Sequence, residues 1–169
     1  VCSSDLVNIE VQGHSINNTD VVKLLGVKID AKLSFDAHVS EICKKVSAQL
    51  SVLIRFKRIL DIPAKLSILK SFIMPYFRYC AIIYHFCSCK NTQKLESLLE
   101  RSLRYVYDDF NSSYQELLSK ASLTSLELER KRTIVMETFK ICHEIAPEYL
   151  QNLIRSEEHT SELQSHSDL

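Results

Sequence analysis

The sequence predicts a mostly α-helical protein in which a short N-terminal β-hairpin is followed by a bundle of five or six helices. Up to residue 30, apolar and polar residues alternate in short runs, which is the period of a β-strand. After residue 33, apolar residues recur every three or four positions, as on one face of an α-helix. Residues that typically begin helices, together with prolines, divide this second part into successive helices.

The predicted hairpin centres on Val21–Asp30, which alternates as one strand with both faces engaged and follows the alternating run Val7–Val11. Gly26 lies inside it, where a glycine usually marks a bulge or the close approach of another backbone. Lys23 and Lys28 flank this glycine, so a nucleic-acid backbone lying on Gly26 would find an ammonium group on either side. An ordinary edge hairpin with solvated lysines is the alternative.

The first predicted helix begins after Ser34, a good N-cap, and His38 is expected to cap or pack at its first turn. Its apolar stripe comprises Val39, Ile42, Cys43, Val46, Leu50, Leu53 and Ile54. Five basic residues lie largely off that stripe: Lys44, Lys45, Arg55, Lys57 and Arg58. One face of the helix can therefore pack on its neighbours while the other meets a polyanion, although a solvated face explains the same residues equally well.

Pro63 suits the first turn of a second helix, and Pro75 is expected to kink or break it. The stretch from Tyr76 to Phe86 is the densest aromatic run in the chain. Such clusters can stack on bases. Because aliphatic residues are interleaved with the aromatic ones, a buried core helix is the favoured interpretation.

Six cysteines and no signal peptide predict reduced thiols in an intracellular protein. Cys80, His85, Cys87 and Cys89 lack the paired spacing of a structural zinc site, so no metal is expected there. No apolar run reaches the length needed to span a membrane.

The next helix is expected to be capped by Asn91 and to end at Asp108 and Asp109. Its apolar face carries Leu95, Leu98, Leu99, Ser102 and Val106. A Y/F-x-D-D turn between two strands can hold two catalytic metal ions. The residues ending at Asp109 are VYDD, and predicted helices flank them, so both aspartates are expected to end a helix rather than to be catalytic.

Capping boxes at Ser113–Glu116 and Thr124–Glu127 predict the starts of the last two helices. The final helix is expected to end near Pro147. The basic cluster Arg130–Arg132 near its start opposes the helix dipole, so it either pairs with nearby glutamates or meets an external anion.

Several of these segments together resemble the C-terminal part of a LINE-type, jockey-like non-LTR retrotransposon reverse transcriptase. KLLGVKID at 23–30 and LSFDAHVSEICKK at 33–45 are followed, in the family's order and spacing, by PYFRYC at 75–80, LESLLERSLRYVY at 95–107, NSSYQELL at 111–118 and residues 126–150. The resemblance covers about residues 7–154. It implies that residues 7–32 form the primer-grip hairpin of the palm, and residues 33–154 the helical thumb and the helices after it.

The resemblance further implies a non-catalytic segment of an RNA-directed DNA polymerase. Catalytic residues, metal ligands and cofactors are expected to lie elsewhere in the parent protein, which would use Mg²⁺, and the segment is predicted to be inactive alone. Its expected partners are the RNA template and DNA primer duplex and the palm and fingers of the parent, in the nucleus or cytoplasm and without a membrane. The predicted nucleic-acid contacts are Lys23, Leu25, Gly26, Lys28, Lys44, Lys45, Arg55, Lys57 and Arg58. A helical protein-interaction module, or a decayed element copy with no nucleic-acid role, is the alternative.

The charge distribution favours a segment that binds nucleic acid over the alternatives. Residues 23–104 hold 15 Lys and Arg against 6 Asp and Glu, whereas residues 105–154 hold 5 against 8. The basic part directly follows the predicted primer grip, where a polyanion would lie.

Both ends are predicted to be translated sequencing adapter. RSEEHT at 155–160 back-translates to a strand whose reverse complement encodes VCSSDL, the sequence at 1–6. We therefore expect residues 1–6 and 155–169 to be artefacts; a flexible Ser/Glu-rich tail would explain their composition but not this complementarity.

Overall fold

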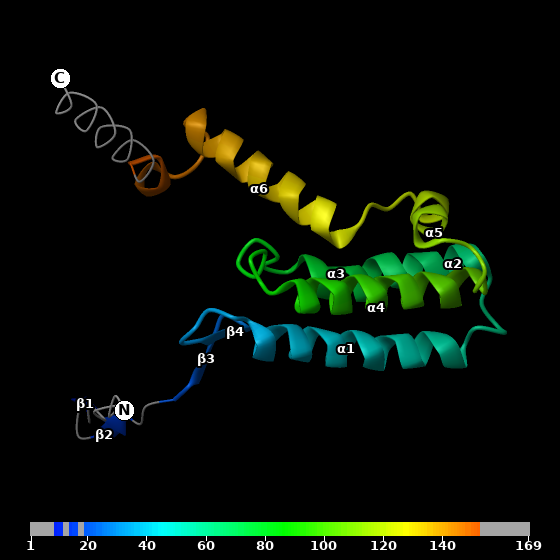
Figure 1. Ribbon diagram of the computed structural model, residues 1–169, viewed down its shortest axis with the longest axis horizontal. Helices are drawn as coiled ribbons and strands as arrows, with labels where there is room; N and C mark the ends of the chain where they lie inside the picture. The colour runs from blue at the N-terminus through cyan, green and yellow to red at the C-terminus, as the bar shows by residue number, and fades with distance from the viewer. Residues whose placement is uncertain (1–8, 12–13, 17–18, 153–169) are drawn as a thin grey trace. The chain divides into compact units, whose positions relative to one another are not determined.

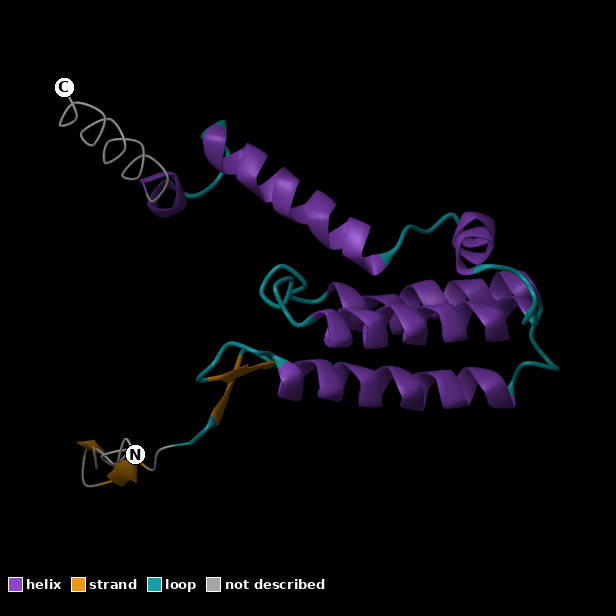
Figure 2. Cartoon of the chain, in the orientation of Figure 1, coloured by secondary structure: helices purple, strands orange, loops and turns teal. Residues whose placement is uncertain are grey.

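A computed structural model describes residues 9–11, 14–16 and 19–152. Within this part, short antiparallel strands precede a series of helices, so the predicted fold class is confirmed (Figure 2). The chain divides into two units, residues 1–123 and 124–169, which we describe separately. The predicted terminal artefacts, 1–6 and 155–169, lie outside the described residues, and the predicted boundary between palm hairpin and helices stays a prediction.

The strands form two separate hairpins (Figure 1). In the first, β1 (Ile9–Val11) pairs with β2 (His14–Ile16). In the second, β3 (Val21–Leu24) pairs with β4 (Val27–Asp30). The predicted run Val7–Val11 thus contains β1, while residues 7 and 8 lie outside the described part.

The prediction of one strand through Gly26 is wrong, because the chain reverses at Leu25 and Gly26. Their φ angles are 46° and 87°, and positive values at both central residues are those of a type I′ hairpin turn. Lys23 consequently faces Lys28 across the hairpin. The error has a simple cause: a two-residue turn leaves the alternation of apolar and polar residues unbroken on either side of it.

The link from β4 to the first helix is organised by the Asp30 carboxylate. It accepts hydrogen bonds from the backbone N–H groups of Lys32, Ser34 and Phe35, at 3.1, 3.0 and 2.8 Å. These bonds, that of Ser34 foremost, lower the pKa of Asp30. Helix α1 (Asp36–Arg55) begins with Phe35 at the N-cap, so the predicted Ser34 cap is one residue early.

Helices α1 and α4 (Cys89–Tyr107) lie side by side and run in the same direction (Figure 1). At their N-terminal ends, Asn91 Nδ2 donates a hydrogen bond to Asp36 Oδ1, at 2.5 Å. Beyond their C-terminal ends, Lys57 Nζ lies 3.1 Å from Asp108 Oδ1. Their buried faces hold most of the predicted apolar residues: Val39, Ile42, Val46, Leu50 and Leu53 in α1, and Leu95, Leu98, Leu99, Ser102 and Val106 in α4.

The chain returns along these helices through α2 (Ile62–Ile68), the π-helical segment η1 (Leu69–Ile73) and α3 (Met74–Arg78). Of the two predicted effects of Pro75, a kink or a break, the break does not occur, since helical residues continue through it to Arg78. Just before the proline the backbone widens, with the Met74 N–H bonded to the carbonyl five residues earlier. A wider turn accommodates a ring that has no N–H to donate and would clash in an ordinary α-helix.

The predicted core helix through the aromatic run is also wrong, because α3 ends at Arg78 and turns follow up to residue 87. Phe77 and Tyr84 are buried, whereas the Phe86 side chain is 86% exposed. The aromatic pattern predicted a helix, but the two buried side chains, Phe77 and Tyr84, are enough to hold this series of turns against the core.

The caps of the remaining helices agree only partly with the prediction. Ser88, not Asn91, caps α4, and Asp108 ends it in the left-handed conformation. The capping box of α5 (Tyr114–Ala121), formed by Ser113 and Glu116, is confirmed. In the second unit α6 (Leu126–Cys142) is capped by Ser125 rather than by the predicted Thr124.

Candidate nucleic-acid interface

The solvent-facing side of α1 carries a line of small and basic residues. Its members recur at steps of three and four, which places them on one face of the helix: Ala37, Ser40, Lys44, Ala48, Ser51 and Arg55. Lys44 and Arg55 are exposed and lie about 16 Å apart along the helix axis. Since the residues between them are small and uncharged, an extended polyanion could lie along this face.

A hollow with three lysines opens on this face at the junction of β4 and α1. We call it the lysine hollow; it is lined by Lys28, Ala37, Ser40, Glu41, Lys44, Lys45 and Ala48. Lys28 reaches it from the hairpin and the other two lysines from the helix. The structure therefore brings together three predicted contact residues that are up to 17 positions apart in the chain.

Glu41 bridges two of these lysines. Its carboxylate oxygens lie 2.9 Å from Lys28 Nζ and 2.7 Å from Lys45 Nζ. The hydrogen bonds from Lys45 and Lys28 lower the pKa of Glu41 to about 2, and the bond to Glu41 raises the pKa of Lys45. Lys44 is left as the exposed lysine of the hollow that neither of these ion pairs includes.

At the hairpin turn, the group that approaches Gly26 closely is the Tyr79 side chain. A Cβ atom at Gly26 would lie 3.6 Å from Tyr79 Cε1, and the Tyr79 hydroxyl donates a hydrogen bond to the Leu25 carbonyl oxygen at 2.6 Å. The expected close approach at this glycine is thus made from within the chain. The Leu25 side chain is exposed, and Lys23 and Lys28 lie opposite each other beside the turn.

At the C-terminal end of α1 and just beyond it, the three remaining predicted contacts differ in exposure and pairing. Arg55 and Arg58 are exposed. Lys57 is half-buried and paired with Asp108, so it is a weaker candidate for binding phosphate.

Sequence reasoning missed three basic residues on α4. Lys90, Lys94 and Arg101 line a hollow with Cys43 and Ser47 of α1, on the flank of the lysine-bearing face. Their spacing of four and seven residues places them on one side of α4 and could have identified them. We call Lys28, Lys44 and Lys45, together with Lys90, Lys94 and Arg101, the basic surface.

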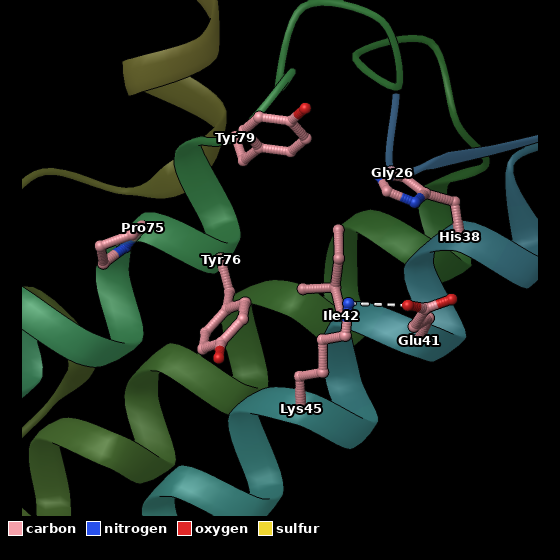
Figure 3. A pocket seen from close by; sticks show the side chains of 8 residues that line it. All are labelled: Gly26, His38, Glu41, Ile42, Lys45, Pro75, Tyr76 and Tyr79. Carbon is pink, nitrogen blue, oxygen red and sulfur yellow. Dashed lines mark ion pairs between the residues drawn. The ribbon is translucent and has the colours of Figure 1, made fainter. Parts of the chain in front are cut away.

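On the other flank of Lys45 lies a cavity of about 360 Å³, which we call the tyrosine hollow (Figure 3). It is lined by Gly26, His38, Glu41, Ile42, Lys45, Pro75, Tyr76 and Tyr79. Figure 3 shows residues of α1, of α3 and its C-cap Tyr79, and Gly26 of the hairpin turn around one space, with the Glu41–Lys45 ion pair at its edge. Apart from that pair, its walls are mostly aromatic and aliphatic.

His38 was expected either to cap the first turn of α1 or to pack there, and it packs. Its Nδ1 accepts a hydrogen bond from the Lys28 backbone N–H at 3.4 Å, and its ring meets that of Tyr84 edge-on at 5.3 Å. Nε2 then carries the proton and has no partner among the described residues. Burial lowers the pKa of His38, so the neutral ring is favoured.

Asp108 and Asp109 end a helix and begin a turn, as predicted. Asp109 accepts hydrogen bonds from the Asn111 and Ser112 backbone and pairs with Lys120 at 2.7 Å. Within the part of the chain that the structure describes, no three His, Cys, Asp or Glu side chains gather as metal ligands.

Over the same described ranges, no helix is both long and apolar enough to cross a membrane. No protein family, curated protein or solved structure matches the chain.

Proposed function

We propose that the chain is the primer-grip and thumb segment of a LINE-type, jockey-like non-LTR reverse transcriptase, and that it holds the backbone of a primer-template duplex without performing the chemistry. The observation that carries the proposal is the basic surface, where six cations from one strand and two helices line two hollows together with small residues of α1. Backbone contacts of this kind are independent of base sequence and come from Lys and Arg.

Several features of the first unit support a rigid platform rather than a loose basic tail. Asn91 bonds to Asp36 at one end of the α1–α4 pair, and Lys57 pairs with Asp108 at the other. Apolar side chains fill the space between the helices. The cations are consequently held on a fixed face, which a polyanion of regular geometry requires.

The test is charge reversal on this face. Replacing both Lys44 and Lys45 by Glu should abolish binding of a short RNA–DNA duplex, measured by fluorescence anisotropy, while the far-UV circular dichroism stays that of the folded chain. The matched control is reversal of Lys131 and Arg132, an adjacent exposed pair on α6 in the other unit. Equal loss of binding in both double variants would argue against a specific face.

A second variant protects the test against misfolding, since a Glu at position 45 would lie beside Glu41. Replacing Lys44 and Arg55 by Gln removes two charges from the exposed line of α1 and leaves the Glu41 pairs intact. We expect it to weaken duplex binding by about tenfold or more, as the loss of two phosphate contacts predicts. Unchanged affinity would contradict the proposal.

The relation to a polymerase has its own test. Sequencing of the parent transcript upstream of the Val7 codon should reveal, in the same frame, a strand–turn–strand segment with a Y/F-x-D-D turn. A closed frame, or a palm-length stretch without that turn, would instead indicate a decayed copy or a repurposed helical segment.

A second candidate function, a helical protein-interaction module, is favoured by one observation on α6. Val135, Met136 and Phe139 expose 53–67% of their surface within three to four positions of one another. Large exposed apolar patches are rare on soluble monomers, and those that occur often mark protein–protein interaction sites. If the chain is such a module, reversing the charges of Lys44 and Lys45 would leave its anisotropy with the RNA–DNA duplex unchanged.

A further inference from the structure

The lysine hollow and the tyrosine hollow share a wall. Glu41 and Lys45 line both, so the two hollows lie on opposite sides of one ion pair. One offers ammonium groups and the other offers aromatic and aliphatic side chains. A ligand that spans the pair would therefore be anionic at one end and flat and apolar at the other.

The tyrosine hollow suits a planar ring. Its volume of about 360 Å³ falls in the range of about 300–1,000 Å³ that small-molecule sites occupy. Tyr76 and Tyr79 contribute aromatic side chains, and Pro75 and Ile42 contribute aliphatic ones. Unstacked bases are held on such side chains in proteins that bind single strands.

One polar atom of the same wall, Nε2 of His38, has no hydrogen-bond partner among the described residues. His38 is 5% exposed, and its Nε2 proton has no acceptor among the described residues. A buried donor without a partner is costly, and most such groups in proteins are satisfied.

We propose that the tyrosine hollow binds the base of one unpaired nucleotide whose phosphate lies on Lys28, Lys44 and Lys45; this rests on the nucleic-acid binding proposed above. The nucleotide would lie at an end of the duplex or in a single-stranded stretch. A paired base would first have to be unpaired and unstacked, which costs free energy that an unpaired base does not require. The Glu41 carboxylate marks the border between the two parts of the site.

The experiment compares three RNA–DNA duplexes on the full chain by fluorescence anisotropy: one blunt, one with a single unpaired 3′ nucleotide, and one in which that nucleotide is abasic. The wild-type chain should bind the overhang duplex about fivefold to tenfold more tightly than the other two, as stacking of one base predicts. Tyr76→Ala should remove this preference without changing the affinity for the blunt duplex, and Tyr76→Phe should keep it. Tyr107→Ala, a half-buried tyrosine at the C-terminal end of α4 and outside the hollow, is the matched control.

A second measurement covers the case in which Tyr76→Ala fails to fold. With 2-aminopurine as the unpaired base, its fluorescence should fall when the wild-type chain binds, because stacking on tyrosine quenches it. Equal affinity for blunt and overhang duplexes, or unchanged 2-aminopurine fluorescence, would overturn the base site while leaving backbone binding intact. Failure of all three duplexes to bind would overturn the proposed function as well.

Discussion

The Tyr79 hydroxyl at the end of α3 donates a hydrogen bond to the Leu25 carbonyl oxygen in the hairpin turn, at 2.6 Å. This contact joins residues 54 positions apart and covers Gly26 with the tyrosine ring. It ties the β3–β4 hairpin, which carries Lys23 and Lys28, to the helices that carry the other cations. The proposed interface depends on that connection, since its lysines come from both parts.

Tyr79→Phe should loosen the hairpin. Removing the hydroxyl leaves a carbonyl that water can still reach, so we expect a loss of about 1 kcal/mol in the free energy of unfolding. Hydrogen exchange in residues 21–30 should quicken, while exchange in α4 stays slow. Tyr149→Phe, an exposed tyrosine of the second unit, is the control. Unchanged exchange in the hairpin would show that the hydroxyl does not hold it.

Gly26→Ala should destabilise the protein by about 1 kcal/mol, because φ is +87° at this position and a positive φ is unfavourable for a residue with a Cβ atom. The added methyl group itself would meet Tyr79 only at ordinary contact distance. Gly26→Asn should cost less, since asparagine tolerates the left-handed region. Urea unfolding of the three proteins tests the order; an alanine variant as stable as the wild type would contradict the turn conformation.

Acid should weaken the Glu41 ion pairs. The pKa of this carboxyl is lowered from 4.5 to about 2 in the folded state, so its stabilising effect is complete above pH 4.5 and disappears as the pH falls toward 2. Both lysine partners are more than a third exposed, which limits the effect to about 1 kcal/mol or less. Glu41→Gln should therefore lose less stability than the wild type between pH 4.5 and 2. Parallel stability curves for the two proteins would refute this.

Two neighbouring cations should behave differently in binding. Arg58 is exposed, so Arg58→Gln should reduce the salt slope of duplex binding by about 1. Lys57 is already neutralised by Asp108, and Lys57→Gln should leave the slope nearly unchanged. Measuring affinity over a range of salt concentrations distinguishes them. A larger effect at Lys57 would mean that nucleic acid displaces Asp108.

The helices were predictable because their apolar residues repeat strongly over many turns. The stripes of α1 and α4 pack as predicted, and the Ser113 capping box is present. The pattern failed at two places. A π-helical turn lets the helix continue through Pro75, and the buried Tyr84 anchors a chain of turns in place of a helix.

The site was predictable only in part. The Glu41–Lys45 pair follows from its spacing of four residues, whereas Lys28 joins it only through the hairpin fold. The residues that line the tyrosine hollow cannot be predicted from the sequence, and neither can the Tyr79–Leu25 hydrogen bond. Both depend on the contact of α3 with the β3–β4 turn, which only the folded structure makes. The basic residues of α4 recur at helical spacing, as those of α1 do, so they could have been predicted from the sequence.

The salt dependence of binding to an RNA–DNA primer-template duplex tests the central claim most directly. If the basic surface and the exposed arginines at the end of α1 together neutralise five or six phosphates, the logarithm of the affinity should fall with the logarithm of the salt concentration with a slope of about −5. A slope near zero, or no binding at low salt, would contradict a backbone-gripping role for this chain.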